Sequence, residues 1–168
     1  MPNRMISSAH RLACWLGALL MIASTVVMAE IRDIDQHLSV AGQPTPEELQ
    51  RFAAEGGMHV IDLRAPAEDR GYDEAAAVDA AGMSYHNLPI VGAAGLTREN
   101  VSKLDNLLAD TQGEKTLLHC ASANRVGALM ALRARWLQGA SRSEALEIGR
   151  QHGLTSLQPR VEELLRED

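Results

Sequence analysis

The sequence predicts an α/β fold with a mainly parallel sheet of about four to five strands flanked by helices. Short apolar segments rich in β-branched residues alternate along the chain with longer segments whose apolar residues recur at helical spacing. The connections are short, and strand–helix–strand alternation favours parallel pairing. With 168 residues and a formal charge of −6, the chain is long enough for one compact domain rather than two.

The predicted elements follow one another with recognisable start and stop signals. The best marked is a helix at 45–56, which has Thr45 as its N-cap, Pro46 at its first position and a glycine at its end. A strand and turn at 38–43 precede it, and a glycine-rich loop is expected at 91–96. The remaining strands are predicted at 59–64, 84–90 and 115–120, and the remaining helices at 72–82, 97–110, 125–139, 141–153 and 158–168.

Residues 1–29 have the pattern of a secretory signal peptide that precedes a domain at 30–168. Arg4 and Arg11 give a positive start without an acidic residue, an uncharged apolar run follows, and small residues end it at Ala29. We therefore expect cleavage after Ala29 and a periplasmic or secreted protein. An uncleaved inner-membrane anchor is the alternative, because the apolar run is just long enough to span a bilayer.

Cleavage would change both the charge and the cysteine content of the chain. It removes two arginines and no acid, which takes the net charge from −6 to −8, and it removes Cys14, so that Cys120 is the only cysteine left. A single thiol forms no internal disulfide, and in an oxidising compartment its presence favours a chemical function. The acidic balance argues against nucleic acid or an anionic membrane as a partner, so an anionic substrate would need a local positive site.

The segment 117–126, LLHCASANRV, joins a predicted strand to a predicted helix. Small residues after the strand allow the backbone to wrap closely around a tetrahedral anion, and the amides at a helix N-terminus favour negative charge there. Arg125 can hold two oxygens of the anion as a bidentate fork. The same field favours the thiolate of Cys120, a nucleophile aimed at the central atom. The predicted anion-binding loop comprises Ala121, Ser122, Ala123, Asn124 and Val126.

The alternative is that this segment has no chemical function. Free cysteine is among the most buried residue types and often behaves as a small hydrophobic residue. Arg125 would then be an ordinary residue on the surface of a helix, and His119 a partly buried histidine at the end of a strand. The combination of strand, small-residue loop, helix start and lone thiol favours the catalytic or anion-binding interpretation.

The order His119-Cys120, four residues, Arg125 resembles the active-site loop of cysteine-dependent phosphatases of the protein-tyrosine and dual-specificity group. A closer resemblance is to the bacterial beta-lactamase-hydrolase-like phosphatase family, in which GQP occurs near the start, R…E after the second strand, and a shortened HC-x-x-G-x-R loop later. The matching residues here, within about 34–138, are Gly42-Gln43-Pro44, Arg64 with Glu68, and the loop itself.

This resemblance implies a dual-specificity-phosphatase-like fold and hydrolysis of a phosphate monoester through a phosphocysteine intermediate. Cys120 and Arg125 would be the catalytic residues, and His119 would orient the loop by hydrogen bonds. The implied partner is a phosphorylated small molecule or protein, and no cofactor is implied. No metal site is predicted, because residues 30–168 contain a single cysteine and their histidines are scattered in sequence, at His37, His59, His86, His119 and His152.

Three departures leave alternatives open. Four residues between Cys120 and Arg125 is the loop length of rhodanese sulfurtransferases, which carry a persulfide, although their motif lacks the preceding histidine. Ala123 stands where both groups favour glycine, and would cost about 1 kcal/mol if that position needs positive φ. Val126 replaces a serine or threonine that assists breakdown of the intermediate. A rhodanese-like sulfurtransferase and a catalytically weak anion-binding module therefore remain as alternatives.

The general acid is the missing part of the phosphatase interpretation. The dual-specificity pattern places an aspartate on the loop after the third strand, and the corresponding loop at 91–96 has no carboxylate. Glu68 and Asp69 are the candidates that remain. Ordinary roles are expected for both: Asp69 as a solvated charge, and Glu68 as the partner of Arg64 in an ion pair that shapes the loop.

Overall fold

The computed structural model describes residues 30–167. The predicted signal peptide at 1–29 lies outside these residues. Over the part that is described, no helix is both long enough and apolar enough to cross a bilayer.

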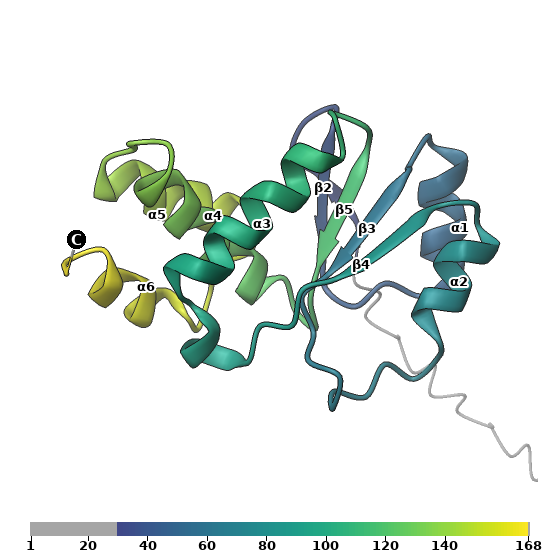
Figure 1. Ribbon diagram of the computed structural model, residues 1–168, viewed down its shortest axis with the longest axis horizontal. Helices are drawn as coiled ribbons and strands as arrows, with labels where there is room; N and C mark the ends of the chain where they lie inside the picture. The colour runs from purple at the N-terminus through teal and green to yellow at the C-terminus, as the bar shows by residue number, and fades with distance from the viewer. Residues whose placement is uncertain (1–29, 168) are drawn as a thin grey trace, which may run out of the picture.

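The centre of the molecule is a five-stranded sheet with the order β1–β2–β5–β3–β4 (Figure 1). All neighbouring strands except β1 and β2 pair in parallel. The Cys120 loop directly follows β5, which is the central strand. The strands are β1 (Arg32–Asp33), β2 (Leu38–Ala41), β3 (His59–Asp62), β4 (Ser84–Asn87) and β5 (Thr116–His119).

Helices cover both faces of the sheet (Figure 1). On one face lie α1 (Pro46–Ala54) and α2 (Glu74–Ala80), and a core that includes Phe52 and Leu117 fills the space beneath them. On the other face a larger core includes Leu118, Cys120 and most apolar residues of the later helices. These are α3 (Arg98–Asp110), α4 (Asn124–Trp136), α5 (Arg142–Gln151) and α6 (Gln158–Leu164).

The central helix α4 is fixed by close contact with the chain that follows it. A Cβ atom on Gly127 would come within 2.1 Å of the Leu154 backbone nitrogen and 2.5 Å of the Gly149 carbonyl oxygen. Only glycine permits this approach, so α4 packs backbone to backbone against the end of α5. The N-terminus of α4, which forms the end of the predicted anion-binding loop, is therefore held on a rigid support.

The α/β class, the mainly parallel sheet and the flanking helices are confirmed, with differences at the ends of elements. The antiparallel strand β1 was not predicted, because two residues give no sequence pattern. The helix expected from residue 72 begins at Glu74, since Asp73 is its N-cap and accepts a hydrogen bond from the Ala76 amide. The loop at 91–96 contains a short 3-10 helix, η1 (Gly92–Gly95).

Candidate active site

The Cys120 loop lies beyond the carboxyl end of the central strand. Cys120 follows β5 and is 1% exposed, and α4 begins at Asn124 after three loop residues. In parallel α/β sheets this edge is where ligands bind. The loops that follow β3 and β4 end at the same edge, because β5 pairs in parallel with β3 and β3 with β4.

The backbone of the loop turns sharply at Ala123. This residue has φ 61° and ψ −9°, the left-handed conformation, and it is the N-cap of α4. The sequence predicts strain at Ala123 if this position needs positive φ. The position does have positive φ, which costs an L-residue about 1 kcal/mol. The first intrahelical hydrogen bond runs from the Gly127 amide to the Ala123 carbonyl at 2.9 Å. The first amides of a helix have no acceptor within the helix, so those of Asn124, Arg125 and Val126 can donate to another group.

The GQP segment supports the loop from the neighbouring strand. Gly42 forms an antiparallel bridge with Ser122, and the Gln43 amide donates to the Ala121 carbonyl at 3.3 Å. The Pro44 carbonyl accepts a hydrogen bond from the Tyr72 hydroxyl at 2.8 Å. Beyond the parallel pairing of β2 with β5, the GQP segment thus pairs with the returning loop in the antiparallel sense, which fixes the two segments beside each other.

Two of the predicted loop residues, Asn124 and Val126, direct their side chains to other parts of the fold. Asn124 Oδ1 accepts from the Thr155 amide at 2.9 Å, and Asn124 Nδ2 donates to Ser156 Oγ at 2.7 Å, which ties the loop to the turn after α5. The Val126 side chain is completely buried in the core. Both residues contribute only backbone amides to the loop, whereas Ala121 and Ser122 are exposed.

Arg125 is held by a carboxylate, and that carboxylate is Glu68. Nη1 donates to Oε1 and Nη2 to Oε2, each at 2.6 Å, in a bidentate pair, and Nη1 also donates to the Ile90 carbonyl at 2.9 Å. The hydrogen bond from Arg125 lowers the pKa of Glu68. In turn Glu68 raises the pKa of Arg125, and the nearby Cys120 adds to that effect. The predicted pairing of Glu68 with Arg64 is wrong, because the loop after β3 crosses toward α4 and presents Glu68 to Arg125.

Arg64 instead lies at the centre of a buried cluster beneath the loop. Its Nε donates to Asp62 Oδ1 at 2.9 Å, and its Nη2 contacts Glu74 Oε2. All three side chains are at most 1% exposed. His119 completes the cluster, with Nε2 2.8 Å from Glu74 Oε1 and 3.8 Å from Asp62 Oδ1. A buried guanidinium between two carboxylates satisfies charges that would otherwise be very costly inside a protein.

His119 is neutral in this setting. Its closest contact with Glu74 is at hydrogen-bond distance but is not aligned as a hydrogen bond, and its ring is fully buried. Burial outweighs the attraction of Asp62 and lowers the pKa of His119 to about 4. The ring contacts Glu74 and Asp62, and an interaction with the backbone of Cys120, the first residue after β5, acts to raise the pKa of His119 against the effect of burial. The loop-orienting role of His119 stays a prediction.

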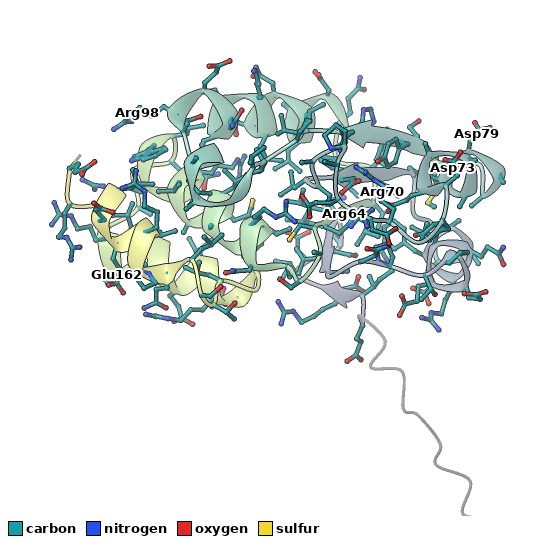
Figure 2. The ribbon with its side chains drawn as sticks, turned by 90° about the horizontal axis from the view of Figure 1, so that it is seen from below. Arg64, Arg70, Asp73, Asp79, Arg98 and Glu162 are labelled. Atoms are coloured by element: carbon teal, nitrogen blue, oxygen red, sulfur yellow. The ribbon has the colours of Figure 1, made fainter. Side chains whose placement is uncertain are left out.

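The segment after β3 also contains a residue that sequence analysis missed, Arg70. Its Nε donates to Asp62 Oδ2 at 3.1 Å, and its guanidinium also donates to the Arg64 carbonyl at 3.2 Å. Figure 2 shows Arg64 and Arg70 close together near the middle of the molecule. A lone arginine in a polar loop gives no signal in the sequence. Asp69, by contrast, is exposed and accepts a hydrogen bond from the Gly71 amide at 2.8 Å.

The cluster beneath the loop has donor atoms of a metal-binding type. One ligand atom each of Asp62, Glu74 and His119 lies within 4.8 Å of the others. The guanidinium of Arg64 already bridges both carboxylates and supplies the positive charge between them. The residues therefore fit an internal ion-pair cluster better than a metal centre.

Comparison with known proteins agrees with this fold. Residues 25–165 match the family model described as PTP-NADK, a DSP-PTPase phosphatase fused to NAD+ kinase. A beta-lactamase hydrolase-like protein of Xylella fastidiosa strain Temecula1 is 33% identical over 129 residues, which cover 74% of this chain and 29% of the relative. A second such protein, from Agrobacterium fabrum, is 27% identical over 124 residues, or 71% of this chain and 28% of the relative. The chain thus spans less than a third of the length of these relatives.

Solved structures share the architecture at low sequence identity. A putative phosphatase from Neisseria meningitidis superposes with a TM-score of 0.68 at 20% identity, covering 82% of this chain and 98% of that one. PTPMT1 gives a TM-score of 0.64 at 21% identity, covering 82% and 92%. A cysteine-to-serine form of Pseudomonas aeruginosa TpbA in complex with pTyr gives 0.59 at 18%, covering 85% and 91%. The chain therefore belongs to the family of DSP-PTPase phosphatases found fused to NAD+ kinase, and it has their protein-tyrosine-phosphatase-like fold.

Proposed function

We propose that this chain is a cysteine-dependent phosphatase that hydrolyses a phosphate monoester, with Cys120 as nucleophile and Arg125 as the residue that binds the transferred group. The observation that carries the proposal is the bidentate pair of Arg125 and Glu68. Its two 2.6 Å hydrogen bonds show that the guanidinium presents both of its terminal nitrogens to a pair of oxygens, and the same guanidinium lies close enough to Cys120 for that residue to raise its pKa. A phosphoryl group presents oxygens to a guanidinium in the same way.

The proposed reaction has two displacements at phosphorus. The Cys120 thiolate attacks, the bond between phosphorus and the ester oxygen breaks, and the leaving oxygen takes up a proton. Water then attacks the phosphocysteine and gives up a proton, the sulfur–phosphorus bond breaks, and inorganic phosphate leaves with the thiolate restored. Arg125 and the helix amides stabilise the charge on the equatorial oxygens in both steps.

Glu68 is our candidate for the proton donor. In the resting pair with Arg125 its pKa is lowered, so it is ionised. A phosphate that takes over the Arg125 fork removes this interaction and adds negative charge nearby, and both changes favour uptake of a proton by Glu68. Asp69 is the weaker candidate, because its carboxylate is exposed and engaged in its own turn.

The dependence on the leaving group tests the role of Glu68. In Glu68→Gln we expect hydrolysis of phenyl phosphate to fall by about 10²-fold, because a poor leaving group needs the proton. Hydrolysis of 4-nitrophenyl phosphate should change much less. Asp69→Asn is the matched control and should leave both rates close to wild type. An equal loss on both substrates in Glu68→Gln would assign it to positioning of Arg125 rather than to proton transfer.

The proposed function itself is tested with 4-nitrophenyl phosphate and vanadate. We expect hydrolysis that vanadate inhibits and that is lost in Cys120→Ser. A rate that persists in Cys120→Ser would reject the mechanism. Vanadate binding without turnover of any ester would instead identify an anion-binding module, the interpretation favoured by the strained Ala123.

A sulfurtransferase is the second candidate, and the four-residue spacing from Cys120 to Arg125 favours it. In that reaction the thiolate would take the outer sulfur of thiosulfate with release of sulfite, and the persulfide would pass this sulfur to cyanide. Treatment with thiosulfate should then add one sulfur atom to the mass of Cys120. An unchanged mass, together with no thiocyanate formed, would exclude this activity.

We also propose export of the domain, on the basis of the charge and apolar pattern of residues 1–29. Expression of the whole chain in a Gram-negative host should yield a periplasmic protein whose N-terminal residue is Glu30. A product that stays in the membrane fraction with residues 1–29 intact would favour the uncleaved anchor.

A further inference from the structure

Two histidines that lie 27 residues apart in the sequence meet on one face of the sheet. His59 begins β3, and His86 in β4 pairs in register with Ile61. Since residues two apart on a strand point to the same face, His59 and His86 are diagonal neighbours on adjacent strands. Nδ1 of His59 lies 3.3 Å from Nε2 of His86. The scattered histidines of the sequence are thus partly gathered by the fold.

Glu114 determines which nitrogen of His59 faces His86. Its Oε2 lies 2.8 Å from His59 Nε2, so that nitrogen carries the hydrogen and Nδ1 directs its lone pair toward His86. The Glu114 backbone is held in place, because its amide donates to the Thr111 carbonyl and its carbonyl accepts from the Thr116 hydroxyl, both at 2.9 Å. A carboxylate behind an imidazole is the arrangement that orients metal-binding histidines.

The separation of the two nitrogens fits a shared metal ion. Two zinc–nitrogen bonds of about 2.05 Å that meet at a tetrahedral angle hold their nitrogens about 3.3 Å apart. The two rings are tilted by 36° with centroids 5.5 Å apart, so they approach through their edges and do not stack. The His59 side chain is 15% exposed and His86 is half-buried. An ion could therefore enter from solvent and keep water in its other positions.

We propose that His59 Nδ1 and His86 Nε2 bind a divalent transition-metal ion, with zinc as the best match, that Glu114 supports His59 from behind, and that water completes the coordination. Imidazole is a preferred ligand of zinc, copper and nickel. Asp110, at the end of α3, adds negative charge that acts on His86 and favours a cation at this place. The partners of His59 are the ring of His86 and the carboxylate of Glu114, whereas the carboxylates of the buried cluster are bound to the guanidinium of Arg64.

The proposed metal site is remote from the catalytic loop. His59 pairs with Thr116 at the beginning of β5, whereas Cys120 follows the end of that strand. The two sites thus lie at opposite ends of parallel strands. The ion would join β3 and β4, and through Glu114 it would stabilise the turn before β5, without contact with the reacting atoms. The inference is therefore independent of the proposed phosphatase activity.

Zinc titration of the purified protein tests this site. The protein should carry no affinity tag and should be treated with a chelator before calorimetric titration with zinc sulfate, with stoichiometry from native mass spectrometry. We expect one zinc ion per chain, and loss of that binding in His59→Gln and in His86→Gln. Glu114→Gln should weaken it by about ten- to a hundredfold. His37→Gln, a change of an exposed histidine whose ring is bound to Gln36, and Cys120→Ser should both bind as wild type does.

Three results would overturn the proposal: no stoichiometric binding by the folded wild type, unchanged binding in both histidine variants, or loss of binding in Cys120→Ser alone. Circular dichroism establishes that each variant is folded. If a histidine variant does not fold, Glu114→Gln decides the question, since that side chain is 53% exposed and its replacement leaves the core intact. Unchanged zinc affinity in Glu114→Gln would then contradict the proposed arrangement.

Discussion

Two arginines of the candidate site are bound by carboxylates, and their surroundings differ. Arg64 is fully buried between Asp62 and Glu74, neither of which is exposed. Arg125 has one carboxylate partner, Glu68, and the two side chains are 12% and 33% exposed. The chemistry of the two pairs is nearly the same, so the difference between them lies in access to solvent.

This difference separates a structural pair from an exchangeable one. Breaking the pair at Arg64 would leave charges inside the protein without water, which is very costly. When the pair at Arg125 breaks, water can solvate Glu68 and another anion can bind Arg125. Exchange of Glu68 for an oxyanion therefore costs little free energy. Burial thus decides which arginine supports the fold and which can bind a ligand.

Replacement of Arg64 should have the largest effect on stability. Arg64→Ala leaves Glu74 buried without a guanidinium and leaves Asp62 with only Arg70 and Tyr85 as its hydrogen-bond donors from side chains, and we expect a loss of about 3–5 kcal/mol in the free energy of unfolding, measured in urea. Arg160→Ala removes a surface pair with Glu163 and should cost less than about 1 kcal/mol. If both variants lost a similar free energy of unfolding, burial would not distinguish a structural ion pair from an exposed one.

Replacement of Arg125 should act on catalysis. Arg125→Lys keeps the charge and loses the fork, so we expect kcat/KM for 4-nitrophenyl phosphate to fall by about 10²–10³-fold, the cost of one lost transition-state donor. The free energy of unfolding should change by less than about 1 kcal/mol, since the pair with Glu68 is partly exposed. A large loss of stability would show that Arg125 is as structural as Arg64.

The pH dependence of stability should report the buried cluster through His119. Its folded-state pKa of about 4 lies below the ordinary value of 6.5, so the unfolded chain binds a proton first as the pH falls. Stability from this group is present above pH 6.5 and is lost between pH 6.5 and about 4, by about 3 kcal/mol. Urea unfolding across this range should show the loss, and His119→Asn should lack it. If the free energy of unfolding fell equally with pH in the wild type and in His119→Asn, a buried neutral His119 would be contradicted.

The smallest effect is expected at Ala123, where no arginine is involved. Ala123→Gly relieves the positive φ and should raise the free energy of unfolding by up to about 1 kcal/mol. Ala121→Gly, at an exposed loop residue without positive φ, is the control and should give no gain. If Ala121→Gly raised the free energy of unfolding by the same amount, the gain in Ala123→Gly could not be assigned to relief of backbone strain.

The fold class and the strand–loop–helix segment around Cys120 could be predicted because their signals are local. Strand, small residues, helix start and the pair of Cys120 and Arg125 lie within one short segment of the chain. The partner of Arg125 could not be predicted, because Glu68 is 57 residues away and reaches it only when two loops cross at the end of the sheet. Arg70 and the two-residue strand β1 were missed because neither has a sequence pattern of its own.

By itself the sequence determined the order of most strands and helices and the thiol at the end of β5, and it marked Ala123 as a residue that would be strained if its φ were positive. Tertiary structure alone decided which charges meet: Arg64 with Asp62 and Glu74, Arg125 with Glu68. It also brought His59 and His86 within 3.3 Å of each other. The physical reason is that backbone preferences act between neighbours in the chain, whereas ion pairs and ligand sites depend on which loops and strands pack together and on how much water they exclude.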